Sequence, residues 1–245
     1  MATEHIMINA DMGEGIGNDR QLMPYVSLCS IACGGHTGNH NTMNHVMDLA
    51  IEHHVGIGAH PSFEDVENFG RKPLNLPLEK LKVSITKQLE VFLNILDSKK
   101  VELHHIKPHG ALYHLISHHE HYAEMIMQII FDFELNSYFF IPYKAKTEYM
   151  FHSVGIPIMK EAFIDRAYHN NYQLVDRSIK GSCYTEYQKI HSHLSQMVFE
   201  KQLLTVESDS IDLHADTYCI HGDNPNAEMI LQSLAVDFKA LKPSH

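Results

Sequence analysis

Residues 105–114 read HIKPHGALYH, and this stretch indicates how the chain folds. A short apolar run ends where Pro108 and Gly110 interrupt it, which is typical of the end of a strand rather than the interior of a helix. Lys107, His109 and Tyr113 lie close together at this point. We therefore expect a strand to end here and to place a cation, an imidazole and a phenol where a reaction can take place.

The same alternation of short apolar runs and helical patterns extends along the whole chain. It favours βα units and a parallel sheet over separate all-α and all-β parts. Seven strands with their helices predict an α/β fold, a closed or nearly closed barrel, in a single domain spanning 1–245. The predicted strands are 6–11, 27–33, 55–60, 103–109, 138–143, 156–163 and 217–222.

Three stretches carry apolar side chains at helical spacing, and we expect these faces to cover the sheet. The first starts near Pro77, the second follows Thr185, and the third follows Asp223-Asn224-Pro225, a predicted cap with proline in the first turn. Two polar stretches, 70–77 and 165–181, interrupt the alternation, and such loops are often functional. The apolar stripes are Leu78, Leu81, Ile85, Leu89, Phe92 and Leu96; Tyr187, Ile190, Leu194 and Met197; and Ile230, Leu234, Phe238 and Leu241.

Charge and composition limit the partners and the compartment of this 245-residue chain. Lys and Arg number 19 and Asp and Glu 30, so the net charge of 19 − 30 = −11 should repel nucleic acid. The four cysteines form no C-x-x-C pair, which fits reduced thiols in the cytoplasm, and Cys33 and Cys219 are interpreted as core residues. No signal-peptide pattern is present, and no run approaches about 18 apolar residues, the length of a membrane span. We expect a cytoplasmic protein without a membrane or nucleic-acid partner.

Polar side chains gather at the carboxyl end of nearly every predicted strand. In an α/β barrel these ends converge on one mouth, where the active site lies. We therefore expect one active site built from these side chains. They are Asn9, Asp11, Glu14, His36, His60, Lys107, His109, Glu161, Asp165, Arg166, His221 and Asp223.

Structural interpretations of the single residues stay open. Asp11 and Glu14 are also compatible with helix caps or the surface. His60 and His109 are also compatible with structural roles, because 21 histidines make any one of them weak evidence. Lys107 is harder to explain in this way, since a buried ammonium requires an anion or a carboxylate.

The sequence HTGNH at 36–40 suggests a metal site. His36 and His40 are spaced i, i+4, which on a helix puts both imidazoles on one face, and an aspartate from the first strand could complete an Asp-His-His set. Metal-dependent polysaccharide deacetylases use a similar set. The motif lacks the glutamate of H-E-x-x-H, and Gly38 weakens a helix there. A divalent metal is therefore compatible with the sequence but has no settled ligands.

Six motifs in order, INADMGEG, IACGGHTG, GIGAHPSFEDVENFGR, IKPHGALYH, KEAFIDRAY and CIHGDNP, resemble the LamB/YcsF family, to which the A subunit of bacterial 5-oxoprolinase belongs. The resemblance implies a distorted, seven-stranded, TIM-barrel-like fold of the glycoside hydrolase/deacetylase type. It also implies ATP-dependent opening of 5-oxoproline (pyroglutamate) to L-glutamate together with partner subunits B and C. Neither G-x-x-x-x-G-K-[ST] nor G-x-G-x-x-G occurs, so we expect the partner subunits to bind the ATP.

Residue by residue, the resemblance gives each matched position an expected role. Catalytic roles fall on Asp11, His60, Lys107, His109 and Glu161. Substrate-binding roles fall on Asn9, Glu14, His36, Arg71, Tyr113, Asp165, Arg166, His221 and Asp223. The chain departs from the family pattern at Gly35, where the family usually has phenylalanine, and at Thr37, Asn39, Asp176 and His214, and His40 is not a family position.

The residue types fit hydrolysis of a lactam that ATP has activated. Our hypothesis is that the partners phosphorylate the lactam and that this chain hydrolyses the product. Asp11, Glu161 or a histidine would be the base, His109 would transfer a proton, and Lys107 with Arg166 would hold phosphate or carboxylate. Two alternatives remain: a metal-dependent deacetylase or carbohydrate-active hydrolase on a similar barrel, and a catalytically silent scaffold for partner subunits.

Overall fold

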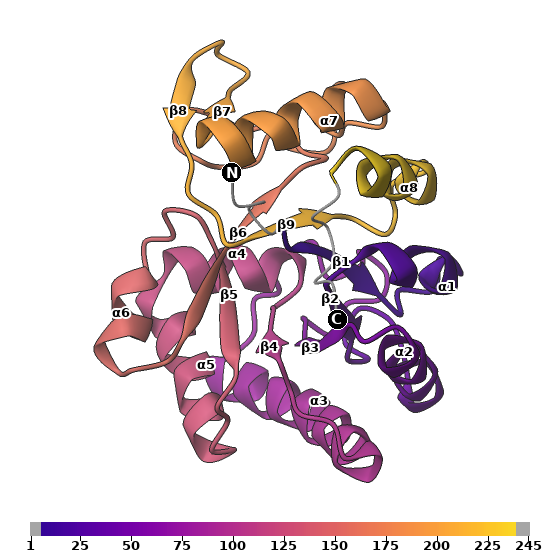
Figure 1. The fold of residues 1–245 in the computed structure, drawn as a ribbon. Coiled ribbons are helices and arrows are strands. Elements are labelled where there is room, and N and C mark those ends of the chain that lie inside the picture. Colours follow the sequence, from indigo (N-terminus) through magenta and orange to yellow (C-terminus); the bar gives the residue numbers. More distant parts are fainter. Residues whose placement is uncertain (1–5, 239–245) are drawn as a thin grey trace.

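The computed structural model describes residues 6–238, and seven parallel strands close into a barrel at its centre (Figure 1). Each barrel strand pairs in parallel with the next one, and the last pairs with the first. The predicted seven-stranded α/β barrel is therefore confirmed. Its strands are β1 (Ile8–Met12), β2 (Leu28–Ala32), β3 (Gly56–His60), β4 (His105–Ile106), β5 (Tyr138–Pro142), β6 (Ile158–Phe163) and β9 (Thr217–Ile220).

Helices lie around the outside of this barrel (Figure 1). The longest, α3 (Leu78–Lys99), buries Leu81, Ile85, Leu89 and Phe92 in the main apolar core, as its predicted stripe requires. The other helices are α1 (Asp19–Leu22), α2 (His40–Glu52), α4 (Gly110–His118), α5 (Glu120–Asp132), α6 (Glu148–Ser153), α7 (Tyr187–Ser195) and α8 (Ala227–Asp237), with a 3₁₀ turn at Met23–Tyr25 and a π-helical turn at Gln196–Glu200.

The strand β4 is much shorter than the predicted 103–109. It consists of His105–Ile106 alone, because Pro108 has no N–H to donate and α4 already begins at Gly110. Lys107 and His109 therefore lie on the link between strand and helix. Tyr113 comes from the first turns of α4, not from the end of a strand.

Two further differences lie near the C-terminus. The last helix begins at Ala227, so Pro225 precedes it, because the side chain of Asn224 is engaged in the loop and accepts a hydrogen bond from the N–H of Asn226. Leu241 of the predicted stripe lies outside the described residues. A short antiparallel hairpin, β7 (Gln202–Leu204) with β8 (Ser210–Asp212), was not predicted, since three-residue strands carry little periodicity.

The barrel interior is closely packed at Gly58. A Cβ at this position would lie 2.1 Å from Nε2 of His105, so the buried imidazole requires glycine there. His105 Nε2 lies 3.0 Å from Ser30 Oγ, and its ring stacks on Phe140. This histidine thus fills the barrel and is not part of a site.

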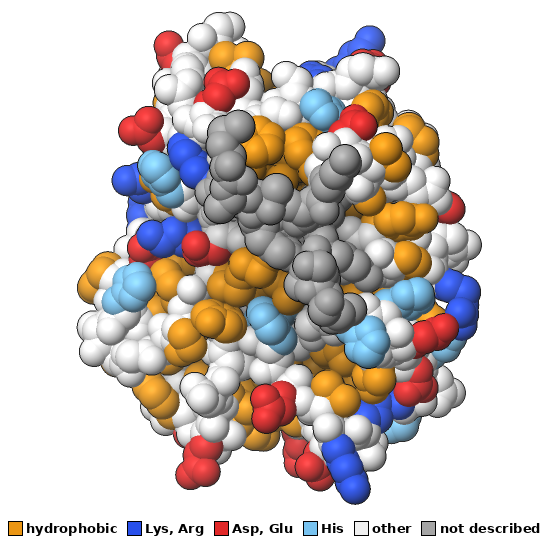
Figure 2. Space-filling model, viewed as in Figure 1, with side chains coloured by type: hydrophobic (Ala, Val, Ile, Leu, Met, Phe, Trp, Pro, Cys, Tyr) orange, Lys and Arg blue, Asp and Glu red, His pale blue; other side chains and the backbone are white. Residues whose placement is uncertain are grey.

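Acidic, basic and histidine side chains are interspersed along the edges of the face in Figure 2. Among the helices within residues 6–238, none combines the length and apolar character that crossing a membrane requires.

His193 on α7 makes the stability of the fold dependent on pH. Its Nδ1 donates to the carbonyl of Ile164 at 3.0 Å, and its Nε2 has no hydrogen-bond partner among the described residues. Burial lowers the pKa of His193 from 6.5 to about 4. The unfolded chain therefore takes up this proton first as the pH falls, so the stability is full above about pH 6.5 and is lost towards pH 4, by up to about 3 kcal/mol.

We expect the loss of stability caused by protonation of His193 to disappear in H193Q. Urea unfolding at several pH values should show the stability difference between the unmodified chain and H193Q shrinking as the pH falls through this window. The change H152Q, at an exposed histidine of α6, is the control for loss of a histidine. A stability difference that stays constant with pH would contradict the prediction.

Candidate active site

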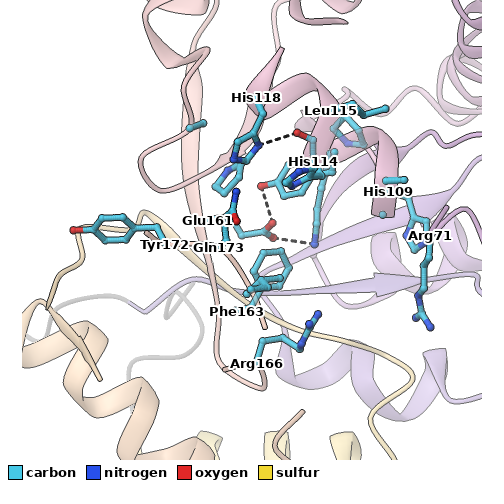
Figure 3. A pocket seen from close by; sticks show the side chains of 18 of the residues that line it. Arg71, His109, His114, Leu115, His118, Glu161, Phe163, Arg166, Tyr172 and Gln173 are labelled. Atoms are coloured by element: carbon cyan, nitrogen blue, oxygen red, sulfur yellow. Dashed lines mark hydrogen bonds and ion pairs between the residues drawn. The ribbon is translucent and has the colours of Figure 1, made fainter. Parts of the chain in front are cut away.

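A cavity of about 610 Å³ opens at the carboxyl ends of the barrel strands. Its walls come from α4 and from the loops that follow β5 and β6, and Figure 3 shows side chains from α4 and from the stretch after β6 around it. Most of the predicted site residues line it: Asp11, Glu14, His60, Arg71, Lys107, His109, Tyr113, Glu161, Arg166 and His221. The others lie behind the lining and each contacts a lining residue: Asn9, His36, Asp165 and Asp223.

Lys107 is held between two carboxylates in the floor of the cavity. Its Nζ lies 2.8 Å from Oδ1 of Asp11 and 2.9 Å from Oε1 of Glu161, and the side chain is 2% exposed. The Oδ1 of Asn9 at 3.4 Å and the Sγ of Cys219 at 3.2 Å complete its surroundings. Two carboxylates, those of Asp11 and Glu161, thus provide the counter-charge that the buried ammonium of Lys107 requires.

Burial and pairing separate the pKa values of these groups. Burial alone raises the pKa of Asp11, but the neighbouring His60 and Lys107 outweigh it and hold that pKa well below its usual range. For Glu161 burial prevails over Lys107, and its pKa is raised. Burial opposes the charge of Lys107, yet its carboxylate partners raise the lysine pKa well above its usual value. Asp11 is therefore the permanent anion, and Glu161 is the carboxyl that takes up a proton more readily.

Tyr113 ties α4 to this charged group. Its hydroxyl donates to Oε2 of Glu161 at 2.9 Å, and burial followed by the charge of Glu161 raises the tyrosine pKa well above its usual value. The phenol therefore stays protonated and acts as a donor.

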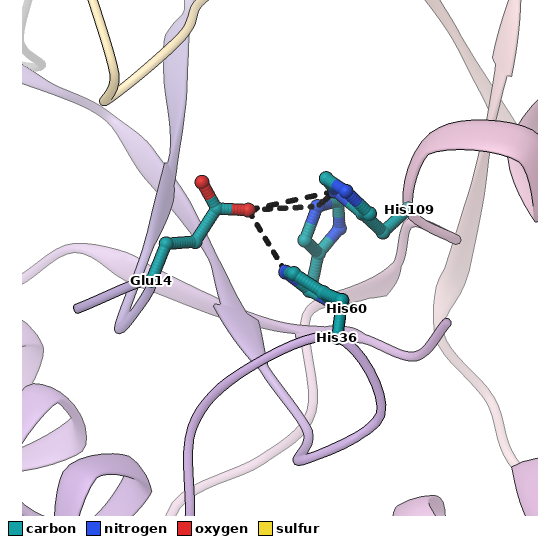
Figure 4. Close-up of side chains that lie close together, drawn as sticks. All are labelled: Glu14, His36, His60 and His109. Carbon is teal, nitrogen blue, oxygen red and sulfur yellow. Dashed lines mark hydrogen bonds and ion pairs between the residues drawn. The ribbon is translucent and has the colours of Figure 1, made fainter. Parts of the chain in front are cut away.

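Glu14, His36, His60 and His109 form a second cluster beside the first, with the carboxylate facing the three imidazoles (Figure 4). The Oε1 of Glu14 lies 3.0 Å from His36 Nε2, 3.5 Å from His109 Nδ1 and 3.8 Å from His60 Nε2. All four residues are buried, and one atom from each lies within 4.8 Å of the others. One carboxylate and three imidazoles could together bind a divalent metal.

The predicted His36–His40 pair is not formed. His36 is completely buried in the loop after β2, whereas His40 is exposed as the first residue of α2. Gly38, with φ of +86°, turns the chain between them, so the two imidazoles share no helical face. Asn39 caps α2 by accepting from the N–H groups of Asn41 and Thr42, which explains the residue at this position without an acid.

Asp165 and His221 form a carboxylate–imidazole pair at the edge of the cavity. His221 Nδ1 lies 2.8 Å from Asp165 Oδ1, and the backbone N–H of His221 donates to Oδ2 at 3.1 Å. Burial raises the pKa of Asp165, but His221 outweighs this and the net pKa is lowered. The ionised carboxylate therefore fixes the tautomer of His221, which leaves Nε2 as the basic nitrogen of a ring that lines the cavity.

Three arginines line the cavity and differ in their partners. Arg71 and Arg177 both donate to Asp223, at 2.5 Å and 3.1 Å, and so join the three loops that follow β3, β6 and β9. Arg166 is buried and donates to the carbonyl of Val175 at 2.7 Å, while its Nε has no hydrogen-bond partner among the described residues. Within residues 6–238, the guanidinium of Arg166 thus differs from the other two in having a backbone carbonyl rather than a carboxylate as its hydrogen-bond partner.

The departure at Gly35 lies behind His36 and not in the cavity. A Cβ there would lie 2.4 Å from Ser62 Oγ and 2.8 Å from Oε1 of Gln88. Gln88, on α3, accepts from the N–H of Ser62 at 3.0 Å and donates to its carbonyl at 2.8 Å. The glutamine thus occupies the space beside Gly35 and fixes Ser62, which hydrogen-bonds His36.

Sequence reasoning missed several residues of the cavity wall. Arg177 and Tyr172 belong to the stretch 165–181, which was predicted to be a functional loop, but nothing in the sequence distinguished them from their neighbours. His114 and His118 of α4 also line the wall. Among 21 histidines no signal marked these two.

Comparison with known proteins identifies the family of this chain. The sequence model described as LamB/YcsF family matches residues 6–242. The chain belongs to this family. It is 32% identical over 225 residues to a protein from Staphylococcus carnosus that is named as the A subunit of 5-oxoprolinase, covering 90% of this chain and 89% of the relative. The crystal structure of a lactam utilization protein from Thermus thermophilus superposes with a TM-score of 0.87 at 30% identity, covering 96% of this chain and 97% of that one.

Proposed function

We propose that this LamB/YcsF chain is the A subunit of an ATP-dependent 5-oxoprolinase and opens 5-oxoproline to L-glutamate together with subunits B and C in the cytoplasm. The observation that carries the proposal is the pair of acid–base groups around one cavity, Asp11–Lys107–Glu161 in its floor and Asp165–His221 at its edge. The name of the Staphylococcus carnosus relative supports it. Opening a lactam requires a base, an acid and charge stabilisation, which these groups can provide.

His221 is the proposed base. With its Nδ1 directed to Asp165, its Nε2 can take a proton from a water molecule as the water oxygen bonds to the activated lactam carbon. His221 returns this proton to the ring nitrogen. The remaining hydroxyl proton of the tetrahedral intermediate reaches the same nitrogen as the C–N bond breaks and the C=O bond forms, which leaves a free amine. If the lactam oxygen carries the phosphoryl group from ATP, the product is an acyl phosphate, which a second water hydrolyses to glutamate and phosphate.

This assignment changes the role expected for His109. Its Nε2 donates to the carbonyl of Phe69 at 2.9 Å, and its Nδ1 faces the Glu14 cluster, 2.9 Å from His60 Nε2, so the contacts of both nitrogens lie within the protein. Proton transfer to substrate therefore falls to His221, whose Nε2 belongs to a ring lining the cavity.

Anion binding falls mainly to Arg166. The charge of Lys107 is shared by Asp11 and Glu161, whereas Arg166 lines the cavity and donates to the carbonyl of Val175 rather than to a carboxylate. A guanidinium in this state can hold the substrate carboxylate or a phosphate. Lys107 then serves to keep Asp11 ionised and to position Glu161.

The test is release of glutamate from 5-oxoproline and ATP. We expect activity when this chain is mixed with its B and C partners, and none when any one of the three is omitted. R166Q should raise KM more than it lowers kcat, because it removes a binding group. Catalytic ATP turnover by the isolated chain would contradict the proposed division of labour, in which the partners bind ATP.

The Glu14 cluster, which could bind a metal, supports one alternative function: a metal-dependent deacetylase or carbohydrate-active hydrolase. Release of acetate from acetylated sugars by the chain alone, with no activity on 5-oxoproline in the presence of both partners, would favour that alternative.

A further inference from the structure

The three imidazoles around Glu14 are oriented by hydrogen bonds on their outer sides. His60 Nδ1 lies 2.6 Å from the carbonyl oxygen of Lys107, and His109 Nε2 lies 2.9 Å from that of Phe69. A carbonyl oxygen can only accept, so the outer nitrogen of each ring carries a proton. In a neutral imidazole the inner nitrogen, which faces Glu14, is then unprotonated and carries a free lone pair.

His36 follows the same pattern through a hydroxyl. Its Nδ1 lies 2.8 Å from Ser62 Oγ, and that hydroxyl donates its own proton to the carbonyl of Phe63 at 3.0 Å. Ser62 therefore accepts from His36, which places the proton on the outer nitrogen of this ring too. Its inner Nε2 faces Glu14 Oε1 at 3.0 Å.

With Glu14 ionised, the inner side of the cluster thus brings acceptors together without a donor. His60 Nε2 lies 2.9 Å from His109 Nδ1, and both face the Glu14 oxygen at 3.8 Å and 3.5 Å. Lone pairs and a carboxylate at such distances repel one another unless a cation lies between them. A divalent cation at the centre of the four side chains would remove this repulsion.

We propose that Glu14, His36, His60 and His109 bind one divalent transition metal ion of the zinc class. Bonds of about 2.0–2.1 Å to a tetrahedral ion place its ligand atoms about 3.3 Å apart. The separations of 2.9, 3.0, 3.5 and 3.8 Å bracket this value. The carbonyl and hydroxyl partners on the outer nitrogens are those that metal-binding histidines generally have.

One rearrangement is required for binding. The rings of His36 and His109 are stacked, with centroids 3.8 Å apart and an interplanar angle of 6°. Because each lone pair lies in the plane of its ring, the stack must open for both rings to reach one ion. Glu14, His60 and His109 line the cavity and His36 lies behind them, so the ion would be reached from the cavity floor.

The decisive measurement is metal content, which does not depend on the proposed function. The chain is stripped with a chelator, dialysed against Zn²⁺ or Co²⁺ and analysed by mass spectrometry. We expect about one ion per chain, absorption bands of tetrahedral Co²⁺, and a rise in thermal stability that corresponds to about 2.7 kcal/mol at a metal concentration of 100 times Kd.

Variants locate the ion. E14Q and H109Q should lose stoichiometric binding, and S62A, which keeps all four ligands but frees His36, should weaken it about 10–100-fold. H40Q, at the exposed histidine of the HTGNH motif, is the matched control and should bind as the unmodified chain does. Circular dichroism verifies that each variant is folded.

Two results would overturn the proposal. A folded, unmodified chain that binds neither ion would mean that protons alone hold the cluster together. Binding that survives in E14Q and H109Q but is lost in H40Q would place the metal elsewhere.

Discussion

Replacing Lys107 by methionine is expected to lower the free energy of unfolding by about 3–5 kcal/mol. The lysine is 2% exposed, and its removal leaves Asp11 and Glu161 buried side by side without their shared cation. Two uncompensated carboxylates in the barrel floor cost far more than the lost contact. Urea unfolding of K107M at neutral pH measures the effect.

Two further variants identify the cause. K160M removes a half-exposed lysine of β6 that pairs with Glu148, and should change the stability by less than about 1 kcal/mol. Adding D11N and E161Q to K107M removes both stranded charges and should restore much of the stability. If the triple variant is no more stable than K107M, loss of packing rather than charge explains the effect.

The change H221Q is expected to lower kcat for glutamate release by about 10²–10⁴-fold. The amide cannot take a proton from water, although it can occupy the space of the imidazole. Folding and metal content should stay as in the unmodified chain, because His221 belongs to neither the Lys107 group nor the Glu14 cluster. Steady-state kinetics with both partner subunits measure the loss.

The carboxylate of Asp165 should also matter for kcat, because it is hydrogen-bonded to His221. D165N should lower kcat as well, since its amide can donate to His221 Nδ1 and so favour the wrong tautomer. H119Q, at an exposed histidine that follows α4, is the control. Activity within tenfold of normal in H221Q, together with its loss in E161Q, would assign the base to Glu161 instead.

Much of the architecture was predictable because it depends on local patterns. Alternating apolar runs and helical stripes indicated the seven strands, and a closed parallel barrel then brings the ends of those strands together. The polar residues at these ends, such as Asp11, Lys107 and Glu161, accordingly meet in one floor.

The pairing of side chains within that floor was not predictable from the sequence. Asp165 and His221 were both expected to bind substrate, but their contact depends on how β6 and β9 lie in register. The i, i+4 spacing of His36 and His40 predicted a shared helical face, and one left-handed glycine was enough to prevent it. Spacing in sequence determines proximity only where the backbone between two residues is regular.

The space beside Gly35 leaves no room for a larger side chain in this chain. The resemblance implies phenylalanine as the usual residue at that position, while here Gln88 of an outer helix fills the volume and bonds both backbone groups of Ser62. G35F made alone would press a ring into Ser62 and Gln88 and would cost about 1–3 kcal/mol or more. Shortening residue 88 would not by itself admit the ring, because Ser62 Oγ and the Ser62 carbonyl oxygen also lie 2.4 Å and 2.8 Å from the Cβ position. A larger residue at position 35 therefore requires both the outer helix and the loop that carries Ser62 to change, although these positions are far apart along the chain.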